Sequence, residues 1–160
     1  YNVRIKSKSG FYLPNPPRDS RTFKTKNGLA NFITSDITYA RSLDKFMMMT
    51  IRSHDQYNTT IYGLDDRYRG IKNGRRVVLM NNNDIINLGL SKGSMVDLCS
   101  EMNSGQVVSP KWFVVPYEIP EGNVATYFPE SNILIPLDSV ADRSNTPTSK
   151  SVPISITKSN

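Results

Sequence analysis

The densest group of polar side chains lies in residues 52–60, directly after an apolar run of strand length. Its members are Arg52, Ser53, His54, Asp55, Gln56, Tyr57, Asn58, Thr59 and Thr60. A segment that leaves the end of a buried strand is a common place for ligand contacts. This mixture of groups suits hydrogen bonding to a heterocycle and a phosphate. On composition alone, a solvated loop is the stronger interpretation.

A catalytic or metal-binding role for this group is poorly supported. Ser53, His54 and Asp55 are adjacent, so their side chains diverge in an extended segment, whereas Ser-His-Asp catalysis needs the three groups converged. The single cysteine, Cys99, and the single histidine cannot supply the four ligands of a structural zinc or an iron–sulfur cluster. Cys99 is expected to be a buried, inert thiol. One cysteine also favours a reducing compartment, so we expect a cytoplasmic protein.

A basic stretch follows the polar group. Its cations are Arg67, Arg69, Lys72, Arg75 and Arg76, with Tyr62 and Tyr68 nearby. Such a stretch can bind nucleic acid or a pyrophosphate, although it is more often a solvated loop or docks on an acidic face.

The net charge of +6 does not by itself indicate nucleic-acid binding. Residues 1–45 hold nine Lys and Arg against three Asp, whereas residues 46–160 hold eleven charges of each sign. A nucleic-acid-binding module carries its basic face on the folded body. The distribution therefore argues against nucleic acid as a partner.

Two later segments offer further polar groups. Residues 127–138 are apolar but contain two prolines, which excludes a central strand and predicts an ordered loop that presents Asn132. Residues 144–150 form a polar turn that ends in Lys150, and a linker is the alternative interpretation.

The lead-in, residues 1–45, is predicted to be extended. The prolines of 13–18 argue against regular structure, and 22–25 and 30–34 are candidate short strands on either side of a turn at Asn27-Gly28. The chain opens with Tyr1 rather than Met, so we expect a fragment of a longer polypeptide.

Residues 46–160 are predicted to form a mainly β domain. The strands are expected at 46–51 (buried on both faces), 77–80, 95–100, 107–108 with 112–115, and 152–156. A very short helix is expected at 83–89, capped by Asn82 or Asn83 and ended by Gly89. Short strands without helical periodicity favour a closed or nearly closed barrel, because closure removes exposed edges. No apolar run is long enough to span a membrane.

Taken in order, several of these segments resemble one known family. They are RSHDQYNTT (52–60), YGLDDRYRG (62–70), YFPESN (127–132) and TPTSK (146–150), preceded by RTFKT (21–25) and GLANF (28–32). The set resembles the C-terminal molybdopterin dinucleotide-binding domain of formate-dehydrogenase-like molybdopterin oxidoreductases. The likeness covers nearly the whole chain.

The resemblance implies a six-stranded double-psi β-barrel that closes over bis(molybdopterin guanine dinucleotide), held mainly by preceding domains. His54 and Gln56 match a His-x-Gln element, and the Pro-Glu-x-Asn element places Asn132 near a pterin. The expected cofactor-binding residues are Arg52, His54, Asp55, Gln56, Asn58, Thr59, Thr60, Asn132 and Lys150. The molybdenum ligand and any 4Fe-4S cluster would lie upstream, so the fragment would hold no catalytic and no metal-binding residue. Its partners would be the upstream domains and the small-molecule substrate of the full enzyme.

Two alternatives remain open from the sequence. An OB-type nucleic-acid-binding barrel would use the basic stretch and its tyrosines as a stacking surface. A peptide-binding or partner-binding adaptor would need an exposed apolar groove.

Overall fold

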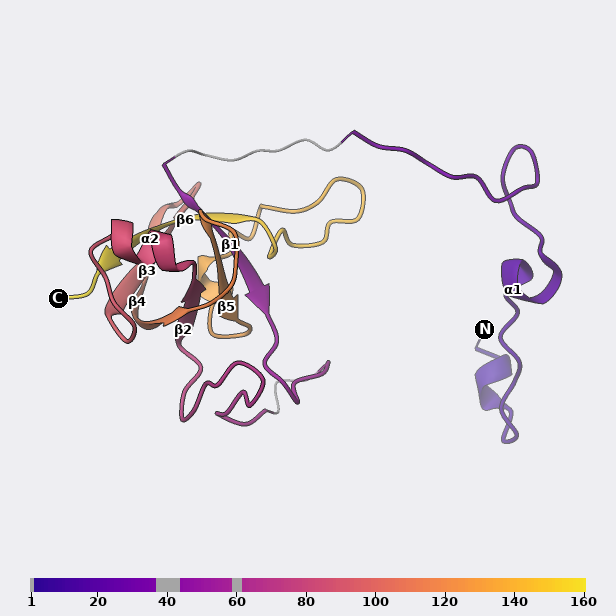
Figure 1. Cartoon of the computed structure of the whole chain (residues 1–160). Coiled ribbons are helices and arrows are strands. Elements are labelled where there is room, and N and C mark those ends of the chain that lie inside the picture. Colours follow the sequence, from indigo (N-terminus) through magenta and orange to yellow (C-terminus); the bar gives the residue numbers. More distant parts are fainter. Residues whose placement is uncertain (1, 37–43, 59–61) are drawn as a thin grey trace. The chain divides into compact units, whose positions relative to one another are not determined.

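The computed structural model describes residues 2–36, 44–58 and 62–160 of the chain (Figure 1). The chain divides into two compact units, Tyr1–Tyr39 and Ala40–Asn160. The boundary expected at residue 45 stays a prediction. None of the described helices is long and apolar enough to cross a membrane.

The first unit contains two short helical turns, η1 at Arg4–Lys6 and α1 at Pro16–Ser20. α1 corrects the expectation that prolines exclude regular structure here. Its prolines occupy the first helical positions, where the missing N–H groups would have no partner within the helix. The side chain of Asn15 caps the helix by accepting a hydrogen bond from the Arg18 N–H at 3.2 Å.

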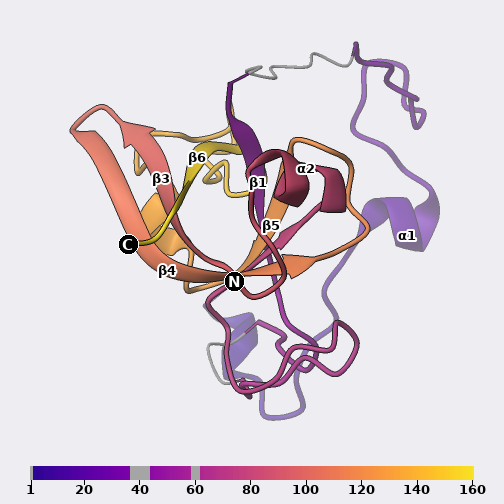
Figure 2. The ribbon, with the colours of Figure 1, turned by 60° about the vertical axis from the view of Figure 1, so that its left-hand side comes forward.

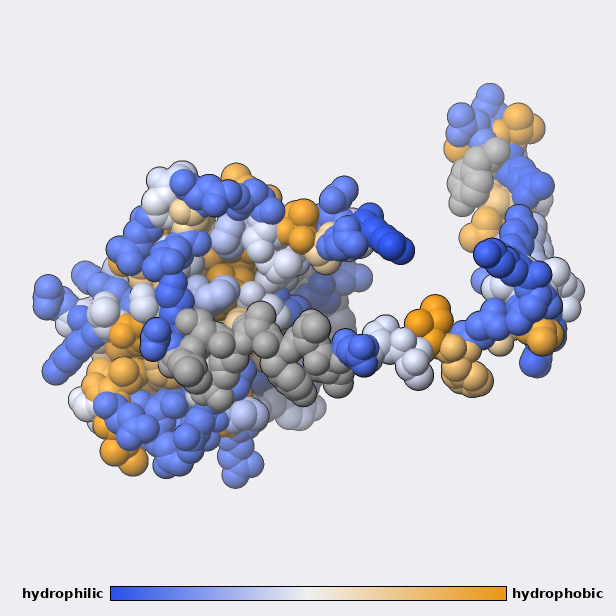
Figure 3. Space-filling view, turned by 90° about the horizontal axis from the view of Figure 1, so that it is seen from above, coloured by the Kyte–Doolittle hydropathy of each residue, from blue (hydrophilic) through white to orange (hydrophobic). Residues whose placement is uncertain are grey.

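The two strands expected in this unit are not formed. Residues 22–25 and 30–34 carry no strand, and the turn between them uses Gly28, whose φ is 69°. Large apolar side chains are exposed here, Phe32 and Ile33 among them. Figure 3 shows apolar and hydrophilic residues intermixed along this segment. In these short runs apolar and polar residues alternate, but neither run pairs with another strand. A strand conformation is therefore not stabilised here.

Six strands of the second unit close into a barrel (Figures 1 and 2). They are β1 Phe46–Ile51, β2 Val77–Met80, β3 Met95–Met102, β4 Gly105–Pro116, β5 Asn123–Tyr127 and β6 Val152–Lys158. Their order round the barrel is β1-β5-β2-β4-β3-β6. The short helix α2, Asn82–Asn87, connects β2 to β3, and the turn η2, Asn132–Leu134, follows β5.

Strand directions identify the type of barrel. β1 pairs with β5 in parallel and β2 with β4 in parallel, while the other four neighbouring pairs are antiparallel. A closed six-stranded barrel with two parallel pairs agrees with the double-psi β-barrel, and the predicted fold class is confirmed. The OB-type alternative is wrong, because that fold has five strands.

The barrel encloses an apolar core from all six strands. Trp112, Met48, Leu98 and Ile154 are among its fully buried members. β1 corrects one expectation, since Met48 is buried whereas the neighbouring Met49 is 39% exposed. The strand therefore buries one face rather than two.

β2 is buried on both faces, as is most of β5. Val78 and Met80 point into the main core, whereas Val77 and Leu79 join a second apolar cluster with Ile71. Ile71 belongs to the segment before β2, so this second cluster holds that segment against the barrel wall. It thereby positions the polar side chains that the segment carries.

Three further elements differ from the sequence prediction. The runs at 107–108 and 112–115 belong to one continuous strand, β4, and β5 was not predicted at all. The cap of α2 is Asn81, whose Oδ1 accepts a hydrogen bond from the Asn83 N–H at 2.8 Å. Gly89 follows the helix with a φ of 65°, as expected.

Candidate functional site

The polar segment after β1 is folded back as a tight turn. Asp55 has a φ of 65°, in the left-handed region, and the Gln56 N–H donates to the Ser53 carbonyl oxygen at 3.2 Å. This turn brings His54 Nε2 within 3.0 Å of Asp55 Oδ1. The expected divergence of these two side chains is therefore wrong, because the backbone between them is not extended.

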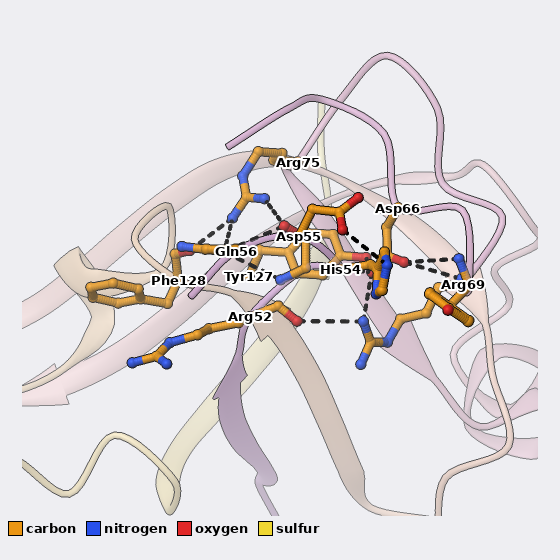
Figure 4. A network of polar contacts seen from close by, with 11 residues as sticks. Arg52, His54, Asp55, Gln56, Asp66, Arg69, Arg75, Tyr127 and Phe128 are labelled. Carbon is orange, nitrogen blue, oxygen red and sulfur yellow. Dashed lines mark hydrogen bonds and ion pairs between the residues drawn. The ribbon is translucent and has the colours of Figure 1, made fainter. Parts of the chain in front are cut away.

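Gln56 is a buried structural connector. Its Nε2 donates to the Phe128 carbonyl oxygen at 2.9 Å, and its Oε1 accepts from the Ser53 N–H at 3.2 Å. Oε1 also accepts from Nη2 of Arg75 at 2.9 Å (Figure 4). The amide thus ties the turn after β1 to the segment after β5, and it is 5% exposed.

Arg75, which is 4% exposed, is the buried cation of this network. Its Nε donates to Glu130 Oε1 at 2.6 Å and its Nη1 donates to Ser53 Oγ at 2.5 Å. The guanidinium lies 3.7 Å from the Tyr62 ring centroid and 4.9 Å from that of Tyr127. A buried charge needs this degree of pairing, because desolvation without partners costs several kcal/mol.

Asp66 is the buried anion of a second part of the network. It accepts hydrogen bonds from the Tyr127 hydroxyl at 2.7 Å, from Arg69 Nη1 at 2.6 Å and from the His54 N–H at 3.3 Å. Burial by itself would raise the pKa of Asp66, but the hydrogen bonds from Tyr127, Arg69 and His54 outweigh it and lower the pKa to about 2. The pKa of Tyr127 is raised, first by burial and then by its bond to this carboxylate. Asp66 therefore stays ionised and fixes the His54 turn.

His54 lies at the edge of the network. Its ring makes an edge contact with Tyr68 at a centroid distance of 3.9 Å, and Arg67 Nη2 lies 2.9 Å from its Nε2. Ser53 Oγ instead accepts a hydrogen bond from Arg75, so the Ser-His-Asp arrangement is not assembled. No group of three His, Cys, Asp or Glu suited to a metal ion occurs among the described residues.

The residues predicted to bind a ligand separate into buried and exposed groups. Arg52, Asn58 and Asn132 are exposed, and no other described residue hydrogen-bonds their side chains. Lys150 is also an exposed residue, but its Nζ donates to the Thr50 carbonyl oxygen near the end of β1. Thr59 and Thr60 lie outside the described residues.

The predicted ligand-binding residues that the structure describes are collected at one end of the barrel. β1 and β5 run in parallel with Ile51 opposite Tyr127, so the segments that follow both strands leave at the same end. Lys150 reaches the same place, because the Thr50 N–H donates to the Ser149 carbonyl oxygen at 2.9 Å. Exposed amides and cations around a rigid buried network fit a polar, phosphate-bearing ligand.

Sequence reasoning missed the central pair of this network, Arg75 and Glu130. Arg75 was assigned to a solvated basic stretch, and Glu130 was only part of a loop. The one available signal was the position of Arg75 two residues before a strand of four apolar residues. That position gives the side chain access to the barrel end.

Comparison with known proteins identifies the domain. Residues 46–153 match the model of the molydopterin dinucleotide binding domain family. The chain belongs to this family. The match includes all of the buried network described above.

Relatives of this molydopterin dinucleotide binding domain are much longer proteins. The chain is 49% identical over 158 residues to "Uncharacterized oxidoreductase Rv2900c" of Mycobacterium tuberculosis, covering 95% of the chain and 20% of that protein. It is 40% identical over 168 residues to "Protein YdeP" of Escherichia coli K12, covering 100% of the chain and 22% of that protein. The chain therefore spans about a fifth of the length of these relatives.

A solved structure shares the fold of the domain. The acetylene hydratase from Pelobacter acetylenicus superposes with a TM-score of 0.50 at 13% identity, over 71% of this chain and 18% of that one. At this identity the likeness shows the fold alone.

Proposed function

We propose that this domain closes over bis(molybdopterin guanine dinucleotide) in a larger molybdenum-dependent oxidoreductase. The domain supplies one wall of the cofactor site, and upstream domains of the same polypeptide supply the rest. The observation that carries the proposal is the gathering of exposed amides and cations at the ends of β1 and β5, in a domain that belongs to a dinucleotide-binding family. When bound, the molybdenum centre supplies the redox chemistry.

The residues of this chain then have two kinds of role. Arg52, Asn58 and Asn132 contact the cofactor, because their donors and acceptors are exposed at the barrel end. Gln56 positions them, since its hydrogen bonds to Arg75 and Phe128 join the turn that carries Arg52 and Asn58 to the segment that carries Asn132. A preorganised turn binds more tightly, because less conformational entropy is lost on binding.

Cofactor retention in the full-length protein tests this proposal. The double variant Arg52→Gln/Asn132→Ala removes two exposed contacts and leaves the buried network intact. We expect roughly tenfold weaker cofactor binding, by analogy with losses of supporting contacts at metal sites. Molybdenum measured by mass spectrometry and pterin measured by fluorescence after oxidation should fall together.

The matched control is Arg143→Gln/Asn87→Ala, which changes the same residue types at exposed positions that are not among the predicted cofactor-binding residues. This control should retain wild-type molybdenum and pterin. Equal cofactor content in both double variants would contradict the assignment of Arg52 and Asn132.

A finer proposal concerns the substrate of the full enzyme. The segments 52–60, 62–70, 127–132 and 146–150 resemble those of formate-dehydrogenase-like enzymes, so we propose formate or a similarly small substrate. Formate-dependent reduction of a viologen dye by the full-length, molybdenum-loaded protein tests whether formate is the substrate. Absence of that activity in a fully loaded preparation would reject formate and leave the cofactor proposal standing.

A further inference from the structure

A cavity of about 880 Å³ lies between the segment 69–77 and the outer face of β4. Its walls include five cations, and none of the described residues that line it is Asp or Glu. Small-molecule sites commonly measure about 300–1,000 Å³, so the volume suits a ligand of nucleotide size. We call this the basic cavity.

Three of the five cations lack a neutralising partner. Arg69 is paired with Asp66 and Arg75 with Glu130, both at 2.6 Å. The remaining cations, Lys72, Arg76 and Lys92, form no ion pair with another described residue. The cavity therefore keeps an excess of positive charge that attracts an anion.

Arg76 is held in place by the barrel. Its Nη2 donates to Ser109 Oγ at 3.0 Å and to the Pro110 carbonyl oxygen at 2.5 Å, and its guanidinium lies 4.8 Å from the Trp112 ring centroid. A guanidinium fixed in this way loses little entropy when it binds a ligand. Its other nitrogen atoms hydrogen-bond no described residue.

The floor of the cavity is apolar and includes an aromatic ring. Phe113, Val115 and Pro116 lie on β4, and Phe113 is 47% exposed. An exposed ring beside uncompensated cations suits a ligand that combines a flat heterocycle with phosphate groups. An acidic peptide would use the cations but would gain little from the ring.

We propose that the basic cavity binds a nucleoside diphosphate group. Its base packs against Phe113, and its phosphates lie among Lys72, Arg76 and Lys92. The group has two possible sources, the nucleotide half of the dinucleotide cofactor or a free nucleotide. The inference rests on the proposed function only if the nucleotide is half of the dinucleotide cofactor.

Titration calorimetry on the 160-residue chain, whose barrel closes round its own core, tests the binding directly. GDP and inorganic pyrophosphate serve as the two probes. Because stacking of one base contributes about 1–3 kcal/mol, GDP should bind at least about fivefold more tightly than pyrophosphate. Phe113→Leu should remove most of that difference and leave pyrophosphate affinity unchanged.

The cations are tested by Lys72→Gln/Lys92→Gln. This variant should weaken GDP binding by roughly tenfold, whereas Arg143→Gln/Lys158→Gln, which also removes two exposed cations, should change it less than about twofold. Circular dichroism would check that both variants fold. Absence of saturable GDP binding to the wild-type chain overturns the proposal, as does equal weakening by the two double variants.

A second measurement on the full-length protein distinguishes the sources. If Lys72→Gln/Lys92→Gln lowers molybdenum and pterin content, the nucleotide belongs to the cofactor. If cofactor content is unchanged while GDP binding is lost, the ligand is a free nucleotide. A full-length protein that never contains molybdenum would reject the proposed function, yet GDP binding to the 160-residue chain would still support the basic cavity.

Discussion

At the scale of single residues, Asp66 shows how a buried carboxylate can stabilise a ligand-binding turn. Its side chain is 1% exposed, yet it is ionised because Tyr127, Arg69 and the His54 N–H all donate to it. The carboxylate joins the turn after β1, the segment before β2 and the end of β5. The loss of its charge would loosen all three together.

This arrangement predicts a pH-dependent stability. The pKa of Asp66 falls from 3.8 to about 2 on folding, so its contribution is fully present above the unfolded pKa. That contribution, about 2 kcal/mol, is lost as the pH falls from about 5 through 2. Asp66→Asn should lower the free energy of unfolding by about 2 kcal/mol at pH 7 and by much less near pH 2, measured by urea titration.

Asp142→Asn is the control for this prediction, because Asp142 has a 95% exposed side chain. It should change the stability by less than about 0.5 kcal/mol at either pH. An Asp66→Asn effect of equal size at pH 7 and pH 2 would show that the charge of Asp66 is unimportant.

At the scale of structural elements, the ion pair Arg75–Glu130 joins the start of β2 to the segment that follows β5. The two residues are 55 positions apart, and Glu130 also accepts a second bond from Arg75 Nη2 at 3.2 Å. β5 ends and β2 begins at the candidate site. The pair therefore sets the spacing between the two segments that carry Gln56's partners, Arg75 and Phe128.

Matched ion pairs in the chain allow a sharp test of this role. Glu130→Gln leaves Arg75 buried without its counter-charge and should lower the free energy of unfolding by about 3 kcal/mol. Glu101→Gln breaks the Lys45–Glu101 pair, which has the same 2.6 Å separation but a 67% exposed carboxylate. It should cost less than about 1 kcal/mol. If guanidinium unfolding showed the same loss of unfolding free energy for Glu130→Gln and Glu101→Gln, burial of the ion pair would not explain its contribution.

At the scale of the whole molecule, the two units differ in how much they bury. Every residue of the apolar core lies between Met48 and Ile156, and none of the described residues of the first unit is buried. The barrel therefore obtains its stability from its own strands. Residues 2–36 of the first unit contribute no buried side chain to a core.

Truncation tests this division. A chain that begins at Ala40 should unfold cooperatively with a free energy of unfolding within about 0.5 kcal/mol of the full chain, since no core residue is removed. Thermal and urea unfolding followed by Trp112 fluorescence would measure it. A loss of several kcal/mol would show that the barrel depends on residues 1–39.

The sequence by itself determined most strands, because strand formation depends on neighbours along the chain, and the order of four short segments determined the family resemblance. The apolar run before Arg52 and the glycine after α2 are signals of this local kind. The tertiary structure alone decided that Gln56 and Arg75 are buried connectors and that Lys72, Arg76 and Lys92 surround a cavity. Such roles require partners from distant strands, and barrel closure brings those partners together in a way that no local pattern records.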